Sequence, residues 1–198
     1  MRIPLRISSF SFLFVVFGTL YVICDSLESN PTQGSSQMKN TLSLSAPTDR
    51  EIVLIRGFDA PRALVYDAIT KPQLVQRWLL GPPGWSMPVC EIDLRVGGRF
   101  RYLWRNTDGR EMGMSGVYRE LAPPDRIIHT ELFDEDWTGG ETVVTQVLSE
   151  QQSKTTLTVT IRYASEEIRD AVLKSPMETG VAASYDRLEE LVTASARK

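Results

Sequence analysis

The sequence predicts an α+β fold in which a curved antiparallel β-sheet packs against one long C-terminal helix. Three observations lead to this prediction. A β-branched run over residues 51–58 has the composition and length of a strand. From residue 88 to residue 163, apolar and polar residues alternate in stretches with a period of two, which is typical of half-solvated antiparallel strands. An apolar stripe of helical spacing then ends the chain, and this helix alone is long enough to cover the sheet.

Length and charge limit the class of protein. The chain has 198 residues, of which 42% are hydrophobic and 24% charged, as expected for one globular domain with an appendage. The formal net charge is −3 and no basic stripe stands out, so a nucleic-acid partner is not expected. With one histidine and two cysteines, Cys24 and Cys90, the sequence predicts no metal site and no cofactor.

The N-terminal segment has two interpretations. Arg2 and Arg6 precede an uncharged apolar run over residues 7–24, so residues 1–24 are predicted to be a signal peptide or a membrane anchor. Alternatively, the start is mis-assigned and translation begins at Met38. The protein is exported or membrane-anchored in the first case, with residues 7–24 as its membrane contact, and cytoplasmic in the second. Residues 25–49 are rich in Ser, Thr, Asn, Gln and Pro and are predicted to be a disordered linker.

The first strand, residues 51–58, leads into two short helices. Asp59 can cap the first of these, and Pro61 suits its first turn. Pro72 starts the second helix, which places Trp78 on its apolar side. Residues 81–84, Gly-Pro-Pro-Gly, interrupt helical structure and are predicted to form a loop.

The sheet is predicted to contain about seven strands. The next begins near Pro88, and the others span residues 99–105, 112–121, 126–133, 142–148 and 155–163. Gly-Gly at 97–98 and Asp-Gly at 108–109 supply hairpin turns. Alternation places one set of apolar side chains on the inner face of two of these strands: Phe100, Tyr102, Trp104, Leu157, Val159 and Ile161.

Helical structure returns after the last strand. Ser165, followed by two acidic residues, opens a short helix. Pro176 interrupts it, and a long helix is expected to continue to about Ala194. The apolar stripe of this long helix contains Val181, Tyr185, Leu188 and Val192.

Six short motifs, in the same order, resemble the Aha-type branch (activators of heat-shock-protein ATPase homologues) of the START-like, or SRPBCC, superfamily. They are Phe58–Arg62, Trp78 with Gly81-Pro82, Asp93–Phe100, Gly116–Glu120 with Pro123–Arg126, Thr156–Thr158, and Ser184–Leu188. The match covers residues 50–196, so the resemblance implies one domain with a helix-grip fold. It also implies a role in hydrophobic-ligand binding or with a chaperone, and no shared catalytic residue. Leu79, His129 and Val181 stand where aromatic residues are usual in this branch.

The leading interpretation is a non-enzymatic domain that binds a hydrophobic small molecule or lipid in a cavity of several hundred Å3 between the sheet and the C-terminal helix, about the usual size of a ligand site. The alternatives are a stress-response partner that activates a chaperone ATPase, and a cyclase- or hydratase-like enzyme. The residues predicted to line the cavity are Trp78, Trp85, Phe100, Tyr102, Trp104, Met114, His129, Phe133, Gln146, Met177, Val181 and Tyr185. For each residue alone, ordinary core packing is the simpler interpretation.

His129 and Glu131 are the candidate catalytic residues. Both faces of the strand 126–133 are apolar, so alternation leaves its orientation open. The resemblance favours the orientation in which Ile127, His129, Glu131 and Phe133 point inward. An imidazole beside a carboxylate could then act as a general base, while an inert hydrogen-bonded pair is the simpler alternative.

Overall fold

The computed structural model describes residues 41–197, which form an eight-stranded antiparallel sheet and four helices. The strands are β1 (Ser43–Ser45), β2 (Glu51–Phe58), β3 (Trp85–Ile92), β4 (Arg99–Asn106), β5 (Glu111–Ala122), β6 (Arg126–Phe133), β7 (Thr142–Gln151) and β8 (Lys154–Arg162). The helices are α1 (Arg62–Thr70), α2 (Pro72–Trp78), α3 (Glu166–Leu173) and α4 (Met177–Ala196). The spatial order of the strands is β1-β2-β8-β7-β6-β5-β4-β3.

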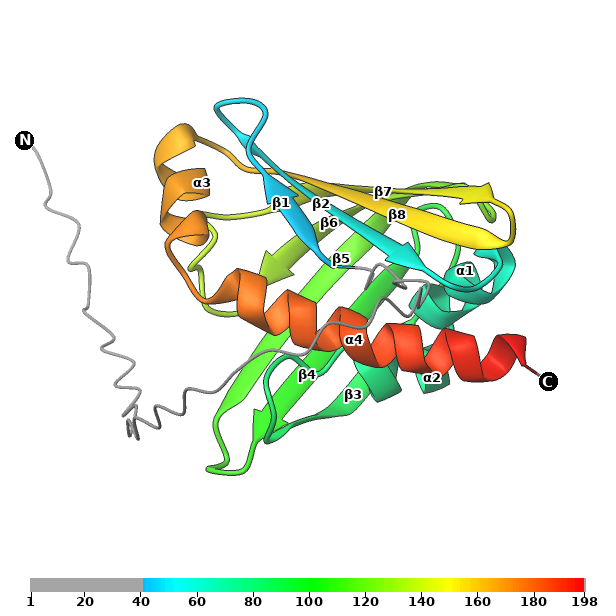
Figure 1. Ribbon diagram of the computed structural model, residues 1–198. Coiled ribbons are helices and arrows are strands. Elements are labelled where there is room, and N and C mark those ends of the chain that lie inside the picture. Colours follow the sequence, from blue (N-terminus) through cyan, green and yellow to red (C-terminus); the bar gives the residue numbers. More distant parts are fainter. Residues whose placement is uncertain (1–40, 198) are drawn as a thin grey trace, which may run out of the picture. The chain divides into compact units, whose positions relative to one another are not determined.

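The sheet curves around α4, which crosses its concave side (Figure 1). Helices α1 and α2 connect β2 to β3, so they fill the end of the sheet beside the C-terminal half of α4. Among the strands, β2 is the one that α4 approaches most closely. The α+β helix-grip prediction is confirmed.

The predicted linker was wrong at its C-terminal end. Residues 43–45 form β1, an eighth strand that pairs Leu44 with Leu54 of β2. Leu44 is half-buried against the core, and the carbonyl of Thr48 accepts a hydrogen bond from Arg169 of α3. Three residues are too few for a recognisable period, which explains why the sequence pattern missed this strand. The predictions for residues 1–24, and for a start at Met38, lie outside the described residues.

Several boundaries also differ from the prediction. The strand expected near Pro88 begins at Trp85, and the register between β3 and β4 shifts between Ser86 and Val89. Proline is tolerated there because β3 lies at the edge of the sheet. The hairpin of β7 and β8 extends to Gln151 and Lys154, and α4 ends at Ala196.

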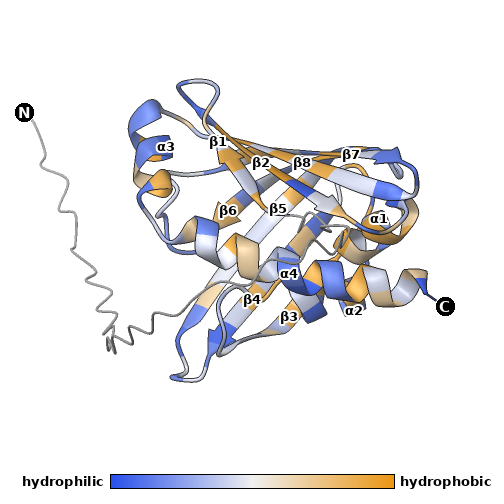
Figure 2. Ribbon diagram, in the orientation of Figure 1, coloured by the Kyte–Doolittle hydropathy of each residue, from blue (hydrophilic) through white to orange (hydrophobic). Residues whose placement is uncertain are grey.

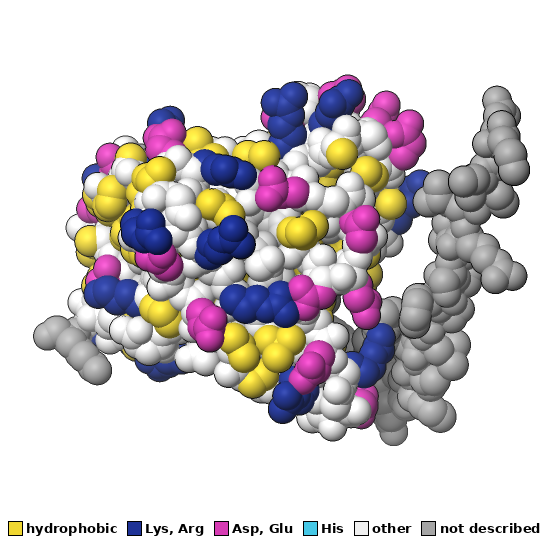
Figure 3. Space-filling model, turned by 180° about the vertical axis from the view of Figure 1, so that it is seen from behind, with side chains coloured by type: hydrophobic (Ala, Val, Ile, Leu, Met, Phe, Trp, Pro, Cys, Tyr) yellow, Lys and Arg dark blue, Asp and Glu magenta, His cyan; other side chains and the backbone are white. Residues whose placement is uncertain are grey.

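The core lies between the concave face and α4. Leu188 and Val192 of α4 are almost fully buried, and so are Ile52 and Leu54 of β2. Figure 2 shows apolar residues alternating with polar ones along α4 and the strands. On the face opposite α4, apolar side chains are interspersed with Lys, Arg, Asp and Glu (Figure 3). This is the pattern of an antiparallel sheet with one buried and one solvated face.

Candidate functional site

The candidate site is centred on His129 and Glu131 of β6. His129 Nε2 lies 3.0 Å from Glu131 Oε1, within hydrogen-bonding distance. His129 is 6% exposed and Ile127 is 2% exposed, whereas Leu132 on the opposite face is 43% exposed. The side chain of Glu131 is 21% exposed, so it lies at the boundary between the interior and solvent. The orientation favoured by the family resemblance is therefore the observed one.

Aromatic rings enclose the imidazole of His129. The ring of Phe100 lies 5.4 Å from it, edge to face, and that of Tyr118 lies 6.1 Å from it. Phe100 reaches this position because its partner across the β4–β5 ladder is Gly116. A Cβ atom at Gly116 would lie 2.4 Å from Phe100 Cζ and 1.8 Å from the carbonyl oxygen of Thr130. Glycine is thus required for this packing.

Four tyrosines of the interior are influenced by the charge of Glu131. The hydroxyl of Tyr102 donates a hydrogen bond to the hydroxyl of Tyr118. Burial, as the main cause, and the negative charge of Glu131, as a lesser one, raise the pKa values of Tyr102, Tyr118, Tyr163 and Tyr185 above the ordinary tyrosine value. These phenols therefore stay protonated at neutral pH and remain hydrogen-bond donors.

Two of the buried side-chain atoms that have no hydrogen-bond partner among the described residues bear on the site. They are His129 Nδ1 and the hydroxyl oxygen of Tyr66 on α1. Buried polar atoms in native proteins nearly always have a partner, so each of these atoms marks a place for a ligand group or a water.

A group of half-buried apolar side chains lies at the end of the sheet nearest the N-terminal half of α4. We call it the mouth; its members are Trp85, Met112, Phe133, Met177 and Val181. Strand pairing places the first three at one end of the sheet, because Trp85 pairs with Asn106, Met112 with Trp104, and Phe133 with Met114.

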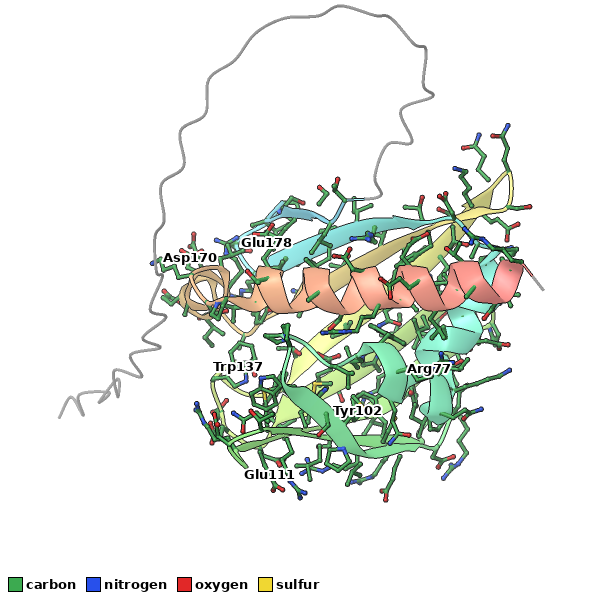
Figure 4. All side chains as sticks on the ribbon, turned by 60° about the horizontal axis from the view of Figure 1, so that its bottom comes forward. Arg77, Tyr102, Glu111, Trp137, Asp170 and Glu178 are labelled. Carbon is green, nitrogen blue, oxygen red and sulfur yellow. The ribbon has the colours of Figure 1, made fainter. Side chains whose placement is uncertain are left out.

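Two contacts bring α4 to this end. Gly180 lies next to Pro82 of the α2–β3 loop, and Ser184 accepts a hydrogen bond from the Gly81 N–H at 2.9 Å. Trp137, 42% exposed, packs on Phe133 with a ring separation of 4.9 Å. Figure 4 shows Trp137 and Tyr102 on the same side of α4.

The other predicted lining residues have structural partners. Trp78 donates its ring N–H to the Ala68 carbonyl at 2.9 Å and packs on Tyr185. Trp104 donates to the Leu79 carbonyl at 2.6 Å. These two indoles therefore anchor the short helices and the following loop. Among the remaining residues, Met114 is buried, and Gln146 is half-buried on the inner face of β7.

Two surface hollows lie elsewhere. One, of about 310 Å3, is lined by Asp59 and the tip of the β7–β8 hairpin, including Lys154. The other, of about 260 Å3, lies between α2 and α4 and is lined by Arg77 and Arg187. Neither is the cavity predicted between the sheet and α4, where the buried aromatic residues pack on one another.

Sequence reasoning missed four members of the site. Tyr118 continues the alternation of Met114 along β5, so the period was a usable signal. Tyr163 likewise continues the inward series of β8, just beyond its end. Cys90 faces inward because it pairs with Tyr102, and burial raises the pKa of its thiol to about 11, so it is protonated and unreactive at neutral pH. No sequence pattern could have indicated Tyr66, because its relevant property is a buried hydroxyl without a hydrogen-bond partner among the described residues, which depends on the surrounding structure.

Within residues 41–197, no three metal-binding side chains of the His, Cys, Asp or Glu type cluster together. In the same part of the chain, no helix has the length and apolar composition needed to cross a membrane.

Comparison with known proteins identifies the family. The family model described as "Activator of Hsp90 ATPase homolog 1-like protein" matches residues 59–193. A crystal structure from Rhodobacter sphaeroides is similar at 34% sequence identity and a TM-score of 0.74, covering 78% of this chain and 99% of that one.

Two further structures share the fold. A Nitrosomonas europaea protein has 22% identity and a TM-score of 0.68, with 77% of this chain and all of that one covered. An AHSA1-like protein from Aeromonas hydrophila has 19% identity and a TM-score of 0.59, with 75% and 95% covered. A search of curated protein sequences finds no significant match. The family match covers most of the domain, and the fold agrees with it. The chain therefore belongs to the activator of Hsp90 ATPase homolog 1-like family, the Aha-type branch of the START-like superfamily.

Proposed function

We propose that this domain binds a hydrophobic small molecule or lipid between the concave face of the sheet and α4. The observation that carries the proposal is the arrangement of an apolar mouth around a deeper polar centre. The mouth residues are half-buried, and the centre contains His129 and Glu131 among tyrosine hydroxyls. Ligand sites in proteins combine mostly apolar walls with a few placed polar groups in the same way.

The unpartnered atoms strengthen the proposal. A buried polar atom that lacks a partner costs about 1–3 kcal/mol of stability. His129 Nδ1 and the Tyr66 hydroxyl are two such atoms. A fold that needed only a well-packed core would place apolar side chains there, so a bound molecule is the natural partner for these atoms.

The cost of opening the site is lowest at the mouth. Met177 and Val181, in the first turns of α4, are half-buried, whereas Leu188 and Val192 farther along are almost fully buried. Repacking a few half-buried side chains loses less apolar burial than moving the rest of the helix. We therefore place the entry of the ligand between the start of α4 and the ends of β4, β5 and β6.

The first experiment identifies the ligand directly. Native mass spectrometry of the full chain, purified from its own host, is expected to show a bound molecule that denaturing conditions release. A fluorescence titration with 8-anilinonaphthalene-1-sulfonate is expected to show binding to the folded protein.

Two matched substitutions test where on the domain the probe binds. Val181→Trp fills the mouth and is expected to weaken binding of the probe at least tenfold. Val147→Trp makes the same change on the solvated face of β7, where Val147 is 40% exposed, and is expected to leave binding unchanged. Equal effects of the two substitutions, or no binding by the wild-type chain, would contradict the proposal.

The contact between His129 and Glu131 favours one second function, a cyclase- or hydratase-like reaction in the same site. A buried imidazole held at 3.0 Å from a carboxylate can take up a proton from a bound substrate. Turnover that follows the titration of a single group, and is lost in His129→Phe, would support this function. Ligand binding without any turnover would leave the binding function alone.

The family name gives the third candidate, a chaperone partner. A pull-down from the native host with the full chain as bait tests it. Specific capture of an Hsp90-type ATPase whose activity rises on addition of the chain would establish this role. Its absence would remove the candidate without affecting ligand binding.

A further inference from the structure

We infer that the ligand carries a hydroxyl group on an apolar body, and that His129 recognises this hydroxyl through Nδ1. The inference rests on the proposed function and names the chemical class of its ligand.

The first step is the tautomer of His129. Its Nε2 lies 3.0 Å from Oε1 of Glu131, and a carboxylate oxygen only accepts hydrogen bonds. Nε2 therefore carries the hydrogen and donates it to Glu131. In the neutral imidazole, Nδ1 is then left with a free lone pair, so it is an acceptor.

The second step is the environment of this acceptor. Nδ1 is buried and has no partner among the described residues. The rings nearest to the imidazole belong to Phe100, which has no donor group, and to Tyr118. The Tyr118 hydroxyl accepts from Tyr102, and it makes no hydrogen bond to Nδ1. The hydrogen-bond donor for Nδ1 therefore comes from outside the described residues, and we assign it to the ligand.

The third step selects the functional group. The hydroxyl of Tyr66, on α1, is also buried and has no partner among the described residues. Burial, and to a smaller extent the charge of Asp67, raise the pKa of Tyr66, so this phenol is a donor at neutral pH. A ligand hydroxyl can donate to an imidazole nitrogen and accept from a phenol. An ether or carbonyl oxygen only accepts, an ammonium group only donates, and a carboxylate would bring a second negative charge close to Glu131.

The fourth step concerns the body of the ligand. Between the polar centre and solvent, the inner face carries Phe100, Met114 and the mouth residues. These side chains offer dispersion contacts and edge-to-face contacts to an aromatic or aliphatic body, and they give no charged group a partner. An alcohol or phenol with a compact apolar body fits both regions.

The experiment compares two probes that differ only in the donor hydrogen. They are 1-naphthol and 1-methoxynaphthalene, titrated by fluorescence or calorimetry into the full chain. The wild-type chain is expected to bind 1-naphthol about three- to tenfold more tightly, the ratio expected for one net hydrogen bond. In His129→Phe, the ratio is expected to fall to about one, with binding of the methoxy compound retained.

Two further variants separate recognition from structure. In Glu131→Gln, the amide can donate to Nε2, so the proton is no longer confined to that nitrogen. The preference for 1-naphthol is expected to fall, and the nitrogen NMR signals of the imidazole are expected to show proton occupancy at Nδ1. Tyr66→Phe is the matched control. Both probes can accept from the Tyr66 hydroxyl, so this change weakens both and leaves their ratio intact.

The outcomes are distinct. If the wild-type chain binds the two probes equally, a water rather than the ligand donates the hydrogen bond to Nδ1. The inference is then wrong, while the proposed function stands. A preference that survives in His129→Phe also overturns it. If neither probe binds, the proposed function and the inference fail together.

Discussion

Replacing Asp186 by alanine is expected to cost more stability than replacing Arg56 by methionine, although both substitutions remove the same ion pair. Arg56 Nη2 of β2 donates to Asp186 Oδ1 of α4 at 2.8 Å. The two ends of the pair differ in burial, since the Arg56 side chain is 6% exposed and that of Asp186 is 59% exposed. Arg56 Nε is buried and has no partner within the described residues. The guanidinium group therefore depends heavily on this one carboxylate.

The magnitude follows from this asymmetry. Removing one partner of a buried pair costs about 3–5 kcal/mol, because a desolvated charge is left behind. Solvent screens the exposed Asp186, which reduces our expectation for Asp186→Ala to about 2 kcal/mol. Arg56→Met keeps the apolar stem in place and removes the buried charge, and Asp186 regains its hydration. We expect this change to cost less than about 1 kcal/mol.

The assay is urea unfolding followed by tryptophan fluorescence, which reports on this region because Trp78 packs on Tyr185, next to Asp186. Glu120→Ala, which breaks an exposed pair with Arg126, is the control and should change stability by less than about 0.5 kcal/mol. Equal costs for Asp186→Ala and Arg56→Met would refute the reasoning. They would mean that the attraction between the partners, and not the desolvated charge, determines the stability at this site.

Three further predictions concern the inner face, a surface pair and the N-terminus. Gly116→Ala should destabilise the domain by at least about 2 kcal/mol in the same assay, because its Cβ atom would collide with the carbonyl oxygen of Thr130; a neutral effect would show that β5 and β6 can separate freely. Hydrogen bonding to Arg101 lowers the pKa of Asp134, so this pair contributes stability above the unfolded-state pKa of an aspartate and loses it as pH falls through the lower folded value. Because both side chains are at least one-third exposed, the contribution should stay below about 0.5 kcal/mol and be absent in Asp134→Asn. If the stability of that variant fell with decreasing pH as steeply as that of the wild-type chain, the prediction would be contradicted. N-terminal sequencing of the native protein is expected to find a first residue upstream of Met38, as an exported or anchored form requires. A chain that begins at Met38 would rule this out.

Alternation was a reliable guide where a strand has one buried and one solvated face. The strand 99–105 was predicted with Phe100, Tyr102 and Trp104 inward, and all three are at most 7% exposed. In β6, alternation failed to choose a face, because Ile128 and Leu132 are as apolar as the residues that point inward. The resemblance to a family supplied the missing orientation. Either face of such a strand could be the buried one, and only the neighbouring strands in the sheet determine which face it is.

The polar centre was less predictable, because it depends on pairing between strands. Tyr118 reaches His129 through a register that shifts between Tyr118 and Glu120, where the β5–β6 ladder is irregular. An irregularity of this kind leaves no mark in the period of either strand. The missing partners of His129 Nδ1 and the Tyr66 hydroxyl are likewise properties of the surroundings, and no sequence pattern encodes them.

The polarity of the inner face is not something that the fold itself requires. A phenyl ring at the position of His129 could pack on Phe100 and Tyr118 without leaving an unpartnered atom. The imidazole instead lowers stability by an amount on the order of 1 kcal/mol, the cost of a buried acceptor without a donor. Glu131 adds a charge at the edge of the interior, where it raises the pKa values of the neighbouring phenols further than burial alone does. A polar pair at this position is not what core packing alone would favour, and it agrees with the ligand recognition that we propose.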